Sequence, residues 1–211
     1  MRRFARQTAP EFWGEYERRW LYETASAKVD PLAWERQKRT LAEHFHEKVR
    51  GAGAPKRCAY CDGPLGAESP ATVDHFIPKH VHRAFGLAWD NLYPACVSCN
   101  STHKGSAWSC ALVRPDVDPV DQWFDFHEET GELHPAPELD RKTRARVRLT
   151  IRVLGLNARE RCIQRRGLLQ ALRVRWSAGD IAYLEEALQV GPYRFVAEKF
   201  RAAKKRFGPL L

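Results

Sequence analysis

The chain has 211 residues, of which 44% are apolar, so it can bury the core of one domain or of a catalytic module with helical additions. It lacks the run of about eighteen apolar residues that a membrane span needs. Residues 1–20 are charged throughout, unlike a signal peptide, so we expect a cytoplasmic protein. The net charge of +9 favours a polyanionic partner, nucleic acid before a membrane.

Residues 1–56 are predicted to form an N-terminal helical segment. Residues 11–28 are rich in aromatic and charged side chains, and Pro10 can stand at or before a first helical turn. A second helix is expected to start after Asp30-Pro31 and to end at Gly51. Its apolar face is formed by residues at helical spacing, namely Trp34, Leu41, Phe45 and Val49.

Residues 57–109 differ from the rest of the chain. They hold four of the six cysteines and four of the eight histidines, and Gly and Pro interrupt their short apolar runs. This pattern predicts small strands, turns and one short helix. Residues 110–140 form an irregular connector, in which we expect a short hairpin between Trp123-Phe124 and Leu133.

Residues 141–211 are predicted to form a basic C-terminal helical segment. Arg141 to Arg175 includes twelve Lys or Arg residues and one acid, Glu160, which indicates either phosphate contact or a solvated basic face. Gly155 should end the first helix, and Asn157 with Glu160 fits a capping box for the next. The apolar side of that second helix is predicted to consist of Ile163, Leu169, Leu172 and Trp176. Two shorter helices are expected at 181–188 and 192–207.

Two C-x-x-C pairs stand 35 residues apart, Cys58 with Cys61 and Cys96 with Cys99. In a reducing compartment, paired cysteines indicate a metal site or catalysis rather than disulfides. Two pairs complete a closed tetrahedral site for one structural Zn²⁺. A redox dithiol would not need the second pair. The isolated Cys110 and Cys162 are expected to be small buried hydrophobes.

Between and after these pairs come three further motifs: Asp74-His75, Asn91-Leu92, and Asn100 directly after Cys99 with a following lysine. In this order they resemble the HNH endonuclease family, whose ββα-metal core binds a catalytic metal. The resemblance implies an α+β, mostly helical chain. Its ββα-metal HNH core with a four-cysteine zinc site would be flanked by N- and C-terminal helices.

The resemblance gives each of these residues a role in phosphodiester hydrolysis. His75 would be the general base, and Asp74 and Asn100 would be oxygen ligands of Mg²⁺ or Mn²⁺. Asn91 would fix the loop that orients His75. Lys79 and Lys104 would contact the phosphate of the substrate.

The lysine departs from the family pattern by one position. Family members often have it three residues after the asparagine, where this chain has His103, and Lys104 follows. His103 would share a helical face with Asn100, so it is the alternative ligand of the catalytic metal.

Outside the core, short motifs resemble the PtuB nucleases of Septu and retron-associated antiphage defence. They include the start of the chain and Leu154-Gly155-Leu156-Asn157. The resemblance implies a DNA-cleaving effector beside an ABC/SMC-like ATPase, PtuA. The large aromatic residues of the flanking helices, such as Trp13, Trp20, Tyr193 and Phe200, would be anchors for that partner or simply core. Cleavage of RNA such as tRNA, and an inactive zinc ribbon that binds nucleic acid, are the alternatives.

Overall fold

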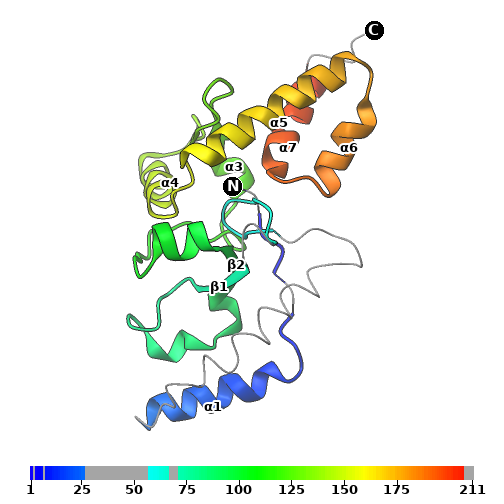
Figure 1. The fold of residues 1–211 in the computed structure, drawn as a ribbon. Helices are drawn as coiled ribbons and strands as arrows, with labels where there is room; N and C mark the ends of the chain where they lie inside the picture. Colours follow the sequence, from blue (N-terminus) through cyan, green and yellow to red (C-terminus); the bar gives the residue numbers. More distant parts are fainter. Residues whose placement is uncertain (2, 7, 27–56, 67–70, 207–211) are drawn as a thin grey trace.

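The centre of the fold is a two-stranded antiparallel sheet followed by a short helix (Figure 1). A computed structural model of the chain describes residues 1, 3–6, 8–26, 57–66 and 71–206. In it β1 (Ala71–His75) pairs with β2 (Leu92–Cys96), so that Ala71 lies opposite Cys96 and His75 opposite Leu92. The 3-10 turns η1 (Arg83–Gly86) and η2 (Trp89–Asn91) lie between the strands. The helix η3 (Ser98–Lys104) follows β2, which gives the predicted strands, turns and short helix.

The helix η3 is wound as a π-helix rather than an α-helix. The backbone N–H of Gly105 donates to the carbonyl of Asn100 at 2.6 Å, a bond from residue i+5 to residue i. Each such bond spans one residue more than in an α-helix, and π-helical turns are frequent at functional sites. This winding therefore changes which side chains of η3 face the sheet.

The N-terminal helix α1 (Trp13–Ala25) lies within the predicted 11–28 and packs on the turns between the strands. The indole N–H of Trp13 donates to the carbonyl of Leu87 at 2.9 Å, and that of Trp20 to the carbonyl of Arg83 at 2.7 Å. Both tryptophans are buried, so they belong to the core and cannot anchor a partner. The second helix predicted after Pro31 lies outside the described residues.

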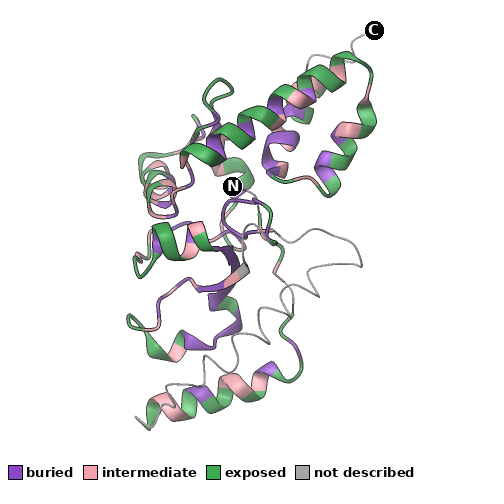
Figure 2. Ribbon diagram, in the orientation of Figure 1, coloured by how far each residue is buried: buried purple, intermediate pink, exposed green. Residues whose placement is uncertain are grey.

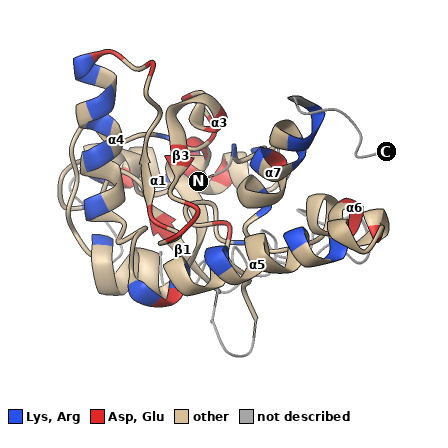
Figure 3. Ribbon diagram, turned by 90° about the horizontal axis from the view of Figure 1, so that it is seen from above, with Lys and Arg blue, Asp and Glu red and all other residues tan. Residues whose placement is uncertain are grey.

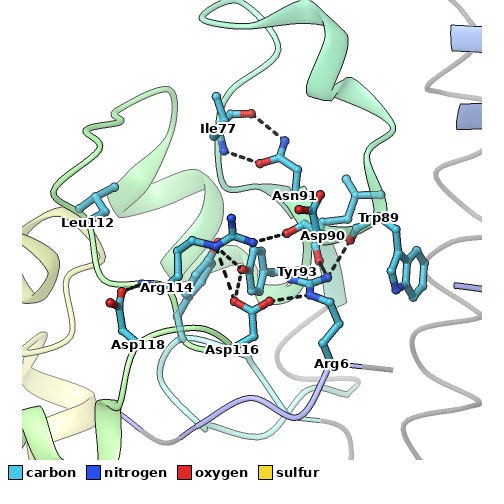
Figure 4. A network of polar contacts seen from close by, with 12 residues as sticks. Arg6, Ile77, Trp89, Asp90, Asn91, Tyr93, Leu112, Arg114, Asp116 and Asp118 are labelled. Carbon is cyan, nitrogen blue, oxygen red and sulfur yellow. Dashed lines mark hydrogen bonds and ion pairs between the residues drawn. The ribbon is translucent and has the colours of Figure 1, made fainter. Parts of the chain in front are cut away.

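The connector contains α3 (Val120–Trp123) and the hairpin of β3 (Phe124–Phe126) with β4 (Leu133–Pro135), which confirms the predicted hairpin. A polar network ties the connector to β2 and to the start of the chain (Figure 4). In it Asp116 pairs with Arg6 at 2.6 Å and accepts from the hydroxyl of Tyr93. Arg114 reaches the same hydroxyl at 3.2 Å. The network holds β2 between two segments distant in sequence.

Four helices follow in the described residues up to 206: α4 (Arg141–Val153), α5 (Arg159–Ser177), α6 (Ile181–Gln189) and α7 (Arg194–Arg206). The carboxylate of Asp140 caps α4 by accepting from the N–H groups of Lys142 and Thr143. In Figure 1 these helices and α1 lie at opposite ends of the molecule, with β1 and β2 between them. Figure 2 shows the buried residues concentrated on the strands and on the facing sides of α5, α6 and α7. Tyr193 and Phe200 are buried there, so these aromatic residues too are core.

The structure corrects two predictions for α5. Asn157 does not cap the helix, because its side chain exchanges two hydrogen bonds with the backbone of Leu133 on β4. Ile163, predicted to lie on the apolar side, is exposed. The inward face of α5 instead runs through Arg161, Arg165 and Leu169, since both arginines find buried partners. A pattern of apolar residues alone places this face wrongly.

Among the described residues, no helix combines the length and apolar character that crossing a membrane requires.

Candidate active site and metal centre

A cleft of about 470 Å³ opens between β1, the loop that follows it and η3. It brings together four residues singled out from the sequence, namely Asp74, His75, Lys79 and Asn100. Thr72 and His80 also line it. The strand sends alternate side chains to opposite faces. Asp74 therefore meets η3 while His75 meets the loop on the other side.

The imidazole of His75 is fixed in one tautomer by the loop between the strands. Its Nε2 lies 2.8 Å from the carbonyl oxygen of Gly86, and a carbonyl can only accept, so Nε2 carries the proton. Nδ1 is then the basic nitrogen. Burial, and then the charge of Lys79, lower the pKa of His75 to about 4, so the ring is neutral at physiological pH.

Two residues hold the Gly86 carbonyl in place. The side-chain amide of Asn91, buried between the strands, accepts from the N–H of Ile77 at 2.7 Å and donates to the Ile77 carbonyl at 3.0 Å (Figure 4). It also donates to the carbonyl of Phe85 at 2.9 Å. The ring of Trp20 covers Gly86 so closely that a Cβ there would lie 2.5 Å from it. The loop that orients His75 is thus closed by Asn91 inside and by α1 outside.

The side chain of Asn100 is oriented by Thr72 on β1. The Thr72 hydroxyl donates to the carbonyl of Ala95 at 2.9 Å, so its oxygen acts as acceptor for the second neighbour. That neighbour is Nδ2 of Asn100, at 2.9 Å. The chain of bonds settles which end of the amide is the nitrogen, and it leaves Oδ1 as the atom that could bind a cation.

Asp74 lies at the centre of a buried polar group. Its Oδ1 accepts from Nζ of Lys104 at 3.0 Å and its Oδ2 from the hydroxyl of Tyr60. Burial raises the pKa of the Asp74 carboxyl, and the charge of Lys104 opposes that rise. The backbone N–H of His75 donates to the same carboxylate. A carboxylate offers about four lone-pair positions, so these three bonds leave room for a cation.

Lys104 differs from its predicted role as a phosphate contact. Its side chain is 1% exposed, and Nζ also donates to the backbone carbonyl of His75 at 2.7 Å. The ammonium is therefore directed into the protein, at the Asp74-His75 pair. Lys104 is the last residue of the π-helix η3, and from there its side chain faces β1.

His103, the alternative metal ligand, lies outside the group of residues that line the cleft. Its exposed ring packs against Gly155, in the turn between α4 and α5. A Cβ at Gly155 would meet that ring at 2.3 Å, and the φ of +55° also favours glycine there. The cleft thus joins Asn100, rather than His103, to Asp74 and His75.

The four cysteines of the two C-x-x-C pairs form one buried cluster. Their sulfur atoms all lie within 4.8 Å of one another, and those of Cys61 and Cys96 are 3.9 Å apart. Tetrahedral Zn–S bonds of about 2.3 Å place sulfurs roughly 3.8 Å apart, so the cluster fits a structural zinc ion. Of the isolated cysteines, Cys162 is buried as predicted, whereas Cys110 is exposed.

Comparison with known proteins agrees with this geometry. Residues 58–105, which contain both cysteine pairs and the cleft residues, match the family described as HNH endonuclease. This segment is an HNH endonuclease domain. A similar protein is the Septu protein PtuB of Bacillus thuringiensis, which is 35% identical over 66 residues. These residues cover 29% of this chain and 25% of that protein, so the match spans about a quarter of the relative's length.

Sequence reasoning missed three contributors to the HNH domain. Thr72 could have been found, because it stands two residues before Asp74 and strand alternation puts both on one face. The hydroxyl of Tyr60 and the carbonyl of Gly86 carry no such signal, since their partners are chosen by packing. His80 also lines the cleft, beside Lys79.

Proposed function

We propose that this chain is a metal-dependent endonuclease that hydrolyses phosphodiester bonds of DNA in the cleft between β1 and η3. We further propose that it is the nuclease effector of a two-component antiphage defence complex. The HNH domain at 58–105 and the similarity to a Septu PtuB protein support this proposal. The observation that carries it is the bond between His75 and Gly86, which prepares one imidazole nitrogen to accept a proton in the cleft.

His75 would act as general base. With Nε2 protonated and bonded to Gly86, Nδ1 takes the proton of a water that attacks the phosphorus atom. The positive charge that forms on the ring is shared through Nε2 with the Gly86 carbonyl. Asn91 supports this arrangement by fixing the loop, so we assign it a positioning role.

Asp74 and Asn100 are the residues that would hold Mg²⁺ or Mn²⁺. They offer a carboxylate and an amide oxygen in one cleft, the ligand types that hard cations prefer. A bound cation would neutralise charge on the phosphate and on the leaving oxygen. Lys104 and Tyr60 hold the Asp74 carboxylate from the protein side. Because Asp74 is buried, we assign Lys104 to the support of this ligand and leave phosphate contact to Lys79.

The basic side chains of α4 and α5 would extend the binding surface for the DNA backbone (Figure 3). The twelve basic residues of 141–175 fall into two groups. Arg144, Arg146, Arg161 and Arg165 donate to protein groups and are at least partly buried. Others, such as Arg148 and Arg152, are exposed on α4. The α4–α5 turn contacts His103 of η3, so this surface adjoins the HNH domain.

A cleavage assay tests the proposal. The purified chain, alone and with its partner, is incubated with plasmid DNA and with total RNA, each with Mg²⁺, Mn²⁺ or EDTA. His75→Ala should abolish cleavage, a loss of roughly a hundred- to ten-thousand-fold, and His134→Ala on β4 should leave it intact. If RNA is cleaved and DNA is not, the substrate is RNA rather than DNA. Binding without cleavage under every condition would identify an inactive zinc-ribbon module.

Asn100→Ala and His103→Ala separate the two candidate ligands. If Asn100 holds the catalytic metal, its removal should raise the Mg²⁺ concentration needed for cleavage, while removal of His103 should not. The reverse result would assign the metal to His103. Elemental analysis should find one zinc per chain, independent of added Mg²⁺. A folded and active protein without zinc would exclude zinc from the four-cysteine site.

For the partner we propose an ABC/SMC-like ATPase of the PtuA kind, by analogy with Septu systems. Co-expression followed by size-exclusion chromatography, with and without nucleotide and DNA, should give co-elution. Separate elution at micromolar concentration under all these conditions would indicate a nuclease that works alone.

A further inference from the structure

Arg161, near the start of α5, reaches the second cysteine pair from the C-terminal helices. Its side chain is buried, and its NH2 group lies 3.2 Å from the sulfur of Cys99 and 3.7 Å from that of Cys96. The same nitrogen donates to the hydroxyl of Ser98 at 2.9 Å. We call the turn of each cysteine pair a knuckle: residues 58–61 form the first and residues 96–99 the second. One guanidinium group thus contacts all three side chains of the second knuckle that can accept a hydrogen bond.

The other side of the guanidinium is held by the turn between α4 and α5. Its NH1 donates to the carbonyls of Leu154 and Gly155, which follow the last turn of α4. Arg161 is therefore fixed from both sides. It bridges the cysteine cluster and the turn against which His103 packs.

The first knuckle meets the C-terminal helices as well. The carboxylate of Asp62, next to Cys61, accepts from the backbone N–H of Arg194 at 2.7 Å, at the start of α7. The Asp62 carbonyl accepts from the N–H of Tyr193 at 3.0 Å. Each cysteine pair is thus bound to a different C-terminal helix, α5 or α7.

The charge of a zinc site explains why an arginine stands here. One zinc ion with four thiolates keeps two net negative charges, and burying them is costly unless they are paired and hydrogen-bonded. A guanidinium offers five N–H donors in a fixed fork and stays protonated. It can therefore donate to sulfur on one edge and to the turn carbonyls on the other.

We infer that Arg161 is a positioning residue of the metal centre: its guanidinium donates to the thiolates of Cys96 and Cys99 and so makes zinc retention depend on the docking of α5. The inference rests on the proposed zinc site. It links the HNH domain to the C-terminal helices through the metal, so that a loss of zinc would also loosen α5 and the α4–α5 turn beside the cleft.

Zinc release tests this inference. The purified protein is first analysed for zinc, and the rate at which zinc passes to a chromogenic chelator is then measured for wild type, Arg161→Met, Arg161→Lys and Arg165→Met. Arg165 is the matched control, since it is also buried on α5 but donates to the Leu156 carbonyl and to the sulfur of Cys162, which is not one of the four clustered cysteines. Loss of a hydrogen-bond partner of a metal ligand typically costs about ten- to a hundred-fold in affinity.

We expect release from Arg161→Met to be about ten- to a hundred-fold faster, and from Arg161→Lys to be intermediate, because an ammonium cannot span both sides of the site. Arg165→Met should keep the wild-type rate. Equal zinc-release rates for Arg161→Met and Arg165→Met would overturn the inference. If Arg161→Met does not fold, a wild-type release rate in Arg161→Lys would overturn it instead. A wild-type protein without zinc would instead refute the zinc site itself.

A second readout follows the sulfur atoms directly. In Co²⁺-substituted protein, the thiolate-to-metal charge-transfer band should shift when N–H donation to sulfur is lost. We expect that shift in Arg161→Met or Arg161→Lys and none in Arg165→Met. An unchanged band in the Arg161 variants would show that the guanidinium does not act on the thiolates.

Discussion

Replacing Lys104 with methionine tests the buried group beneath the cleft. The substitution keeps most of the side-chain volume and removes the ammonium that pairs with Asp74 at 3.0 Å. The side chains of both residues are at most 3% exposed. Breaking such a pair leaves an uncompensated buried charge, which costs about 3 to 5 kcal/mol. For a chain of this length that corresponds to a melting temperature roughly 6 to 20 °C lower.

The penalty should depend on pH. Burial already raises the folded-state pKa of Asp74, and Lys104 counteracts that rise, so the variant should have a still higher pKa. A carboxyl whose folded pKa lies above its unfolded value binds a proton more readily in the folded protein. Its unfavourable contribution is therefore present at high pH and disappears as the pH falls through the folded pKa. The stability of Lys104→Met should approach that of wild type in acid.

Urea denaturation at constant free zinc, followed by circular dichroism at several pH values, measures this effect. Lys142→Met, an exposed lysine on α4, is the control and should change stability by less than about 0.5 kcal/mol. The double variant Asp74→Asn with Lys104→Met should lose less stability than the sum of its parts, since neither charge remains. The reasoning fails if Lys104→Met is as stable as Lys142→Met and only weakens DNA binding, as a surface phosphate contact would.

Three further predictions concern the cleft and the basic surface. Because the pKa of His75 is lowered to about 4, cleavage at saturating metal should stay constant from about pH 8 to pH 5 and decline only as the ring gains a proton; a decline centred on pH 6.5 would contradict this. Thr72→Val should raise the Mg²⁺ concentration needed for cleavage, because it releases the amide of Asn100, whereas Thr72→Ser should need the same concentration as wild type. Identical Mg²⁺ titrations of Thr72→Val and wild type would show that Thr72 does not position Asn100. The double variant Arg148→Gln with Arg152→Gln should flatten the plot of log DNA affinity against log salt concentration by about one unit of slope per lost phosphate contact. An unchanged slope together with weaker binding to the partner protein would assign this surface to that partner.

The sequence by itself determined the chemistry that depends on short spacing. Two residues between cysteines are enough to turn both sulfurs toward one ion, so Cys58 and Cys61 could be read as half of a metal site without any structure. Alternation along a strand likewise requires the side chains of neighbouring residues such as Asp74 and His75 to point to opposite faces. The hairpin of β3 and β4 and the C-terminal helices followed from local patterns of the same kind.

The tertiary structure decided how those groups are held, because the partners lie far apart in the chain. Lys104 was expected at a phosphate, yet from the end of η3 its ammonium donates to Asp74, 30 residues away in sequence. Arg161 looked like one cation in a basic run, and only packing of α5 against the cysteine cluster gives it sulfur partners 62 and 65 residues away. A polar side chain is buried where a partner compensates its desolvation, and that partner exists only once the helices have docked.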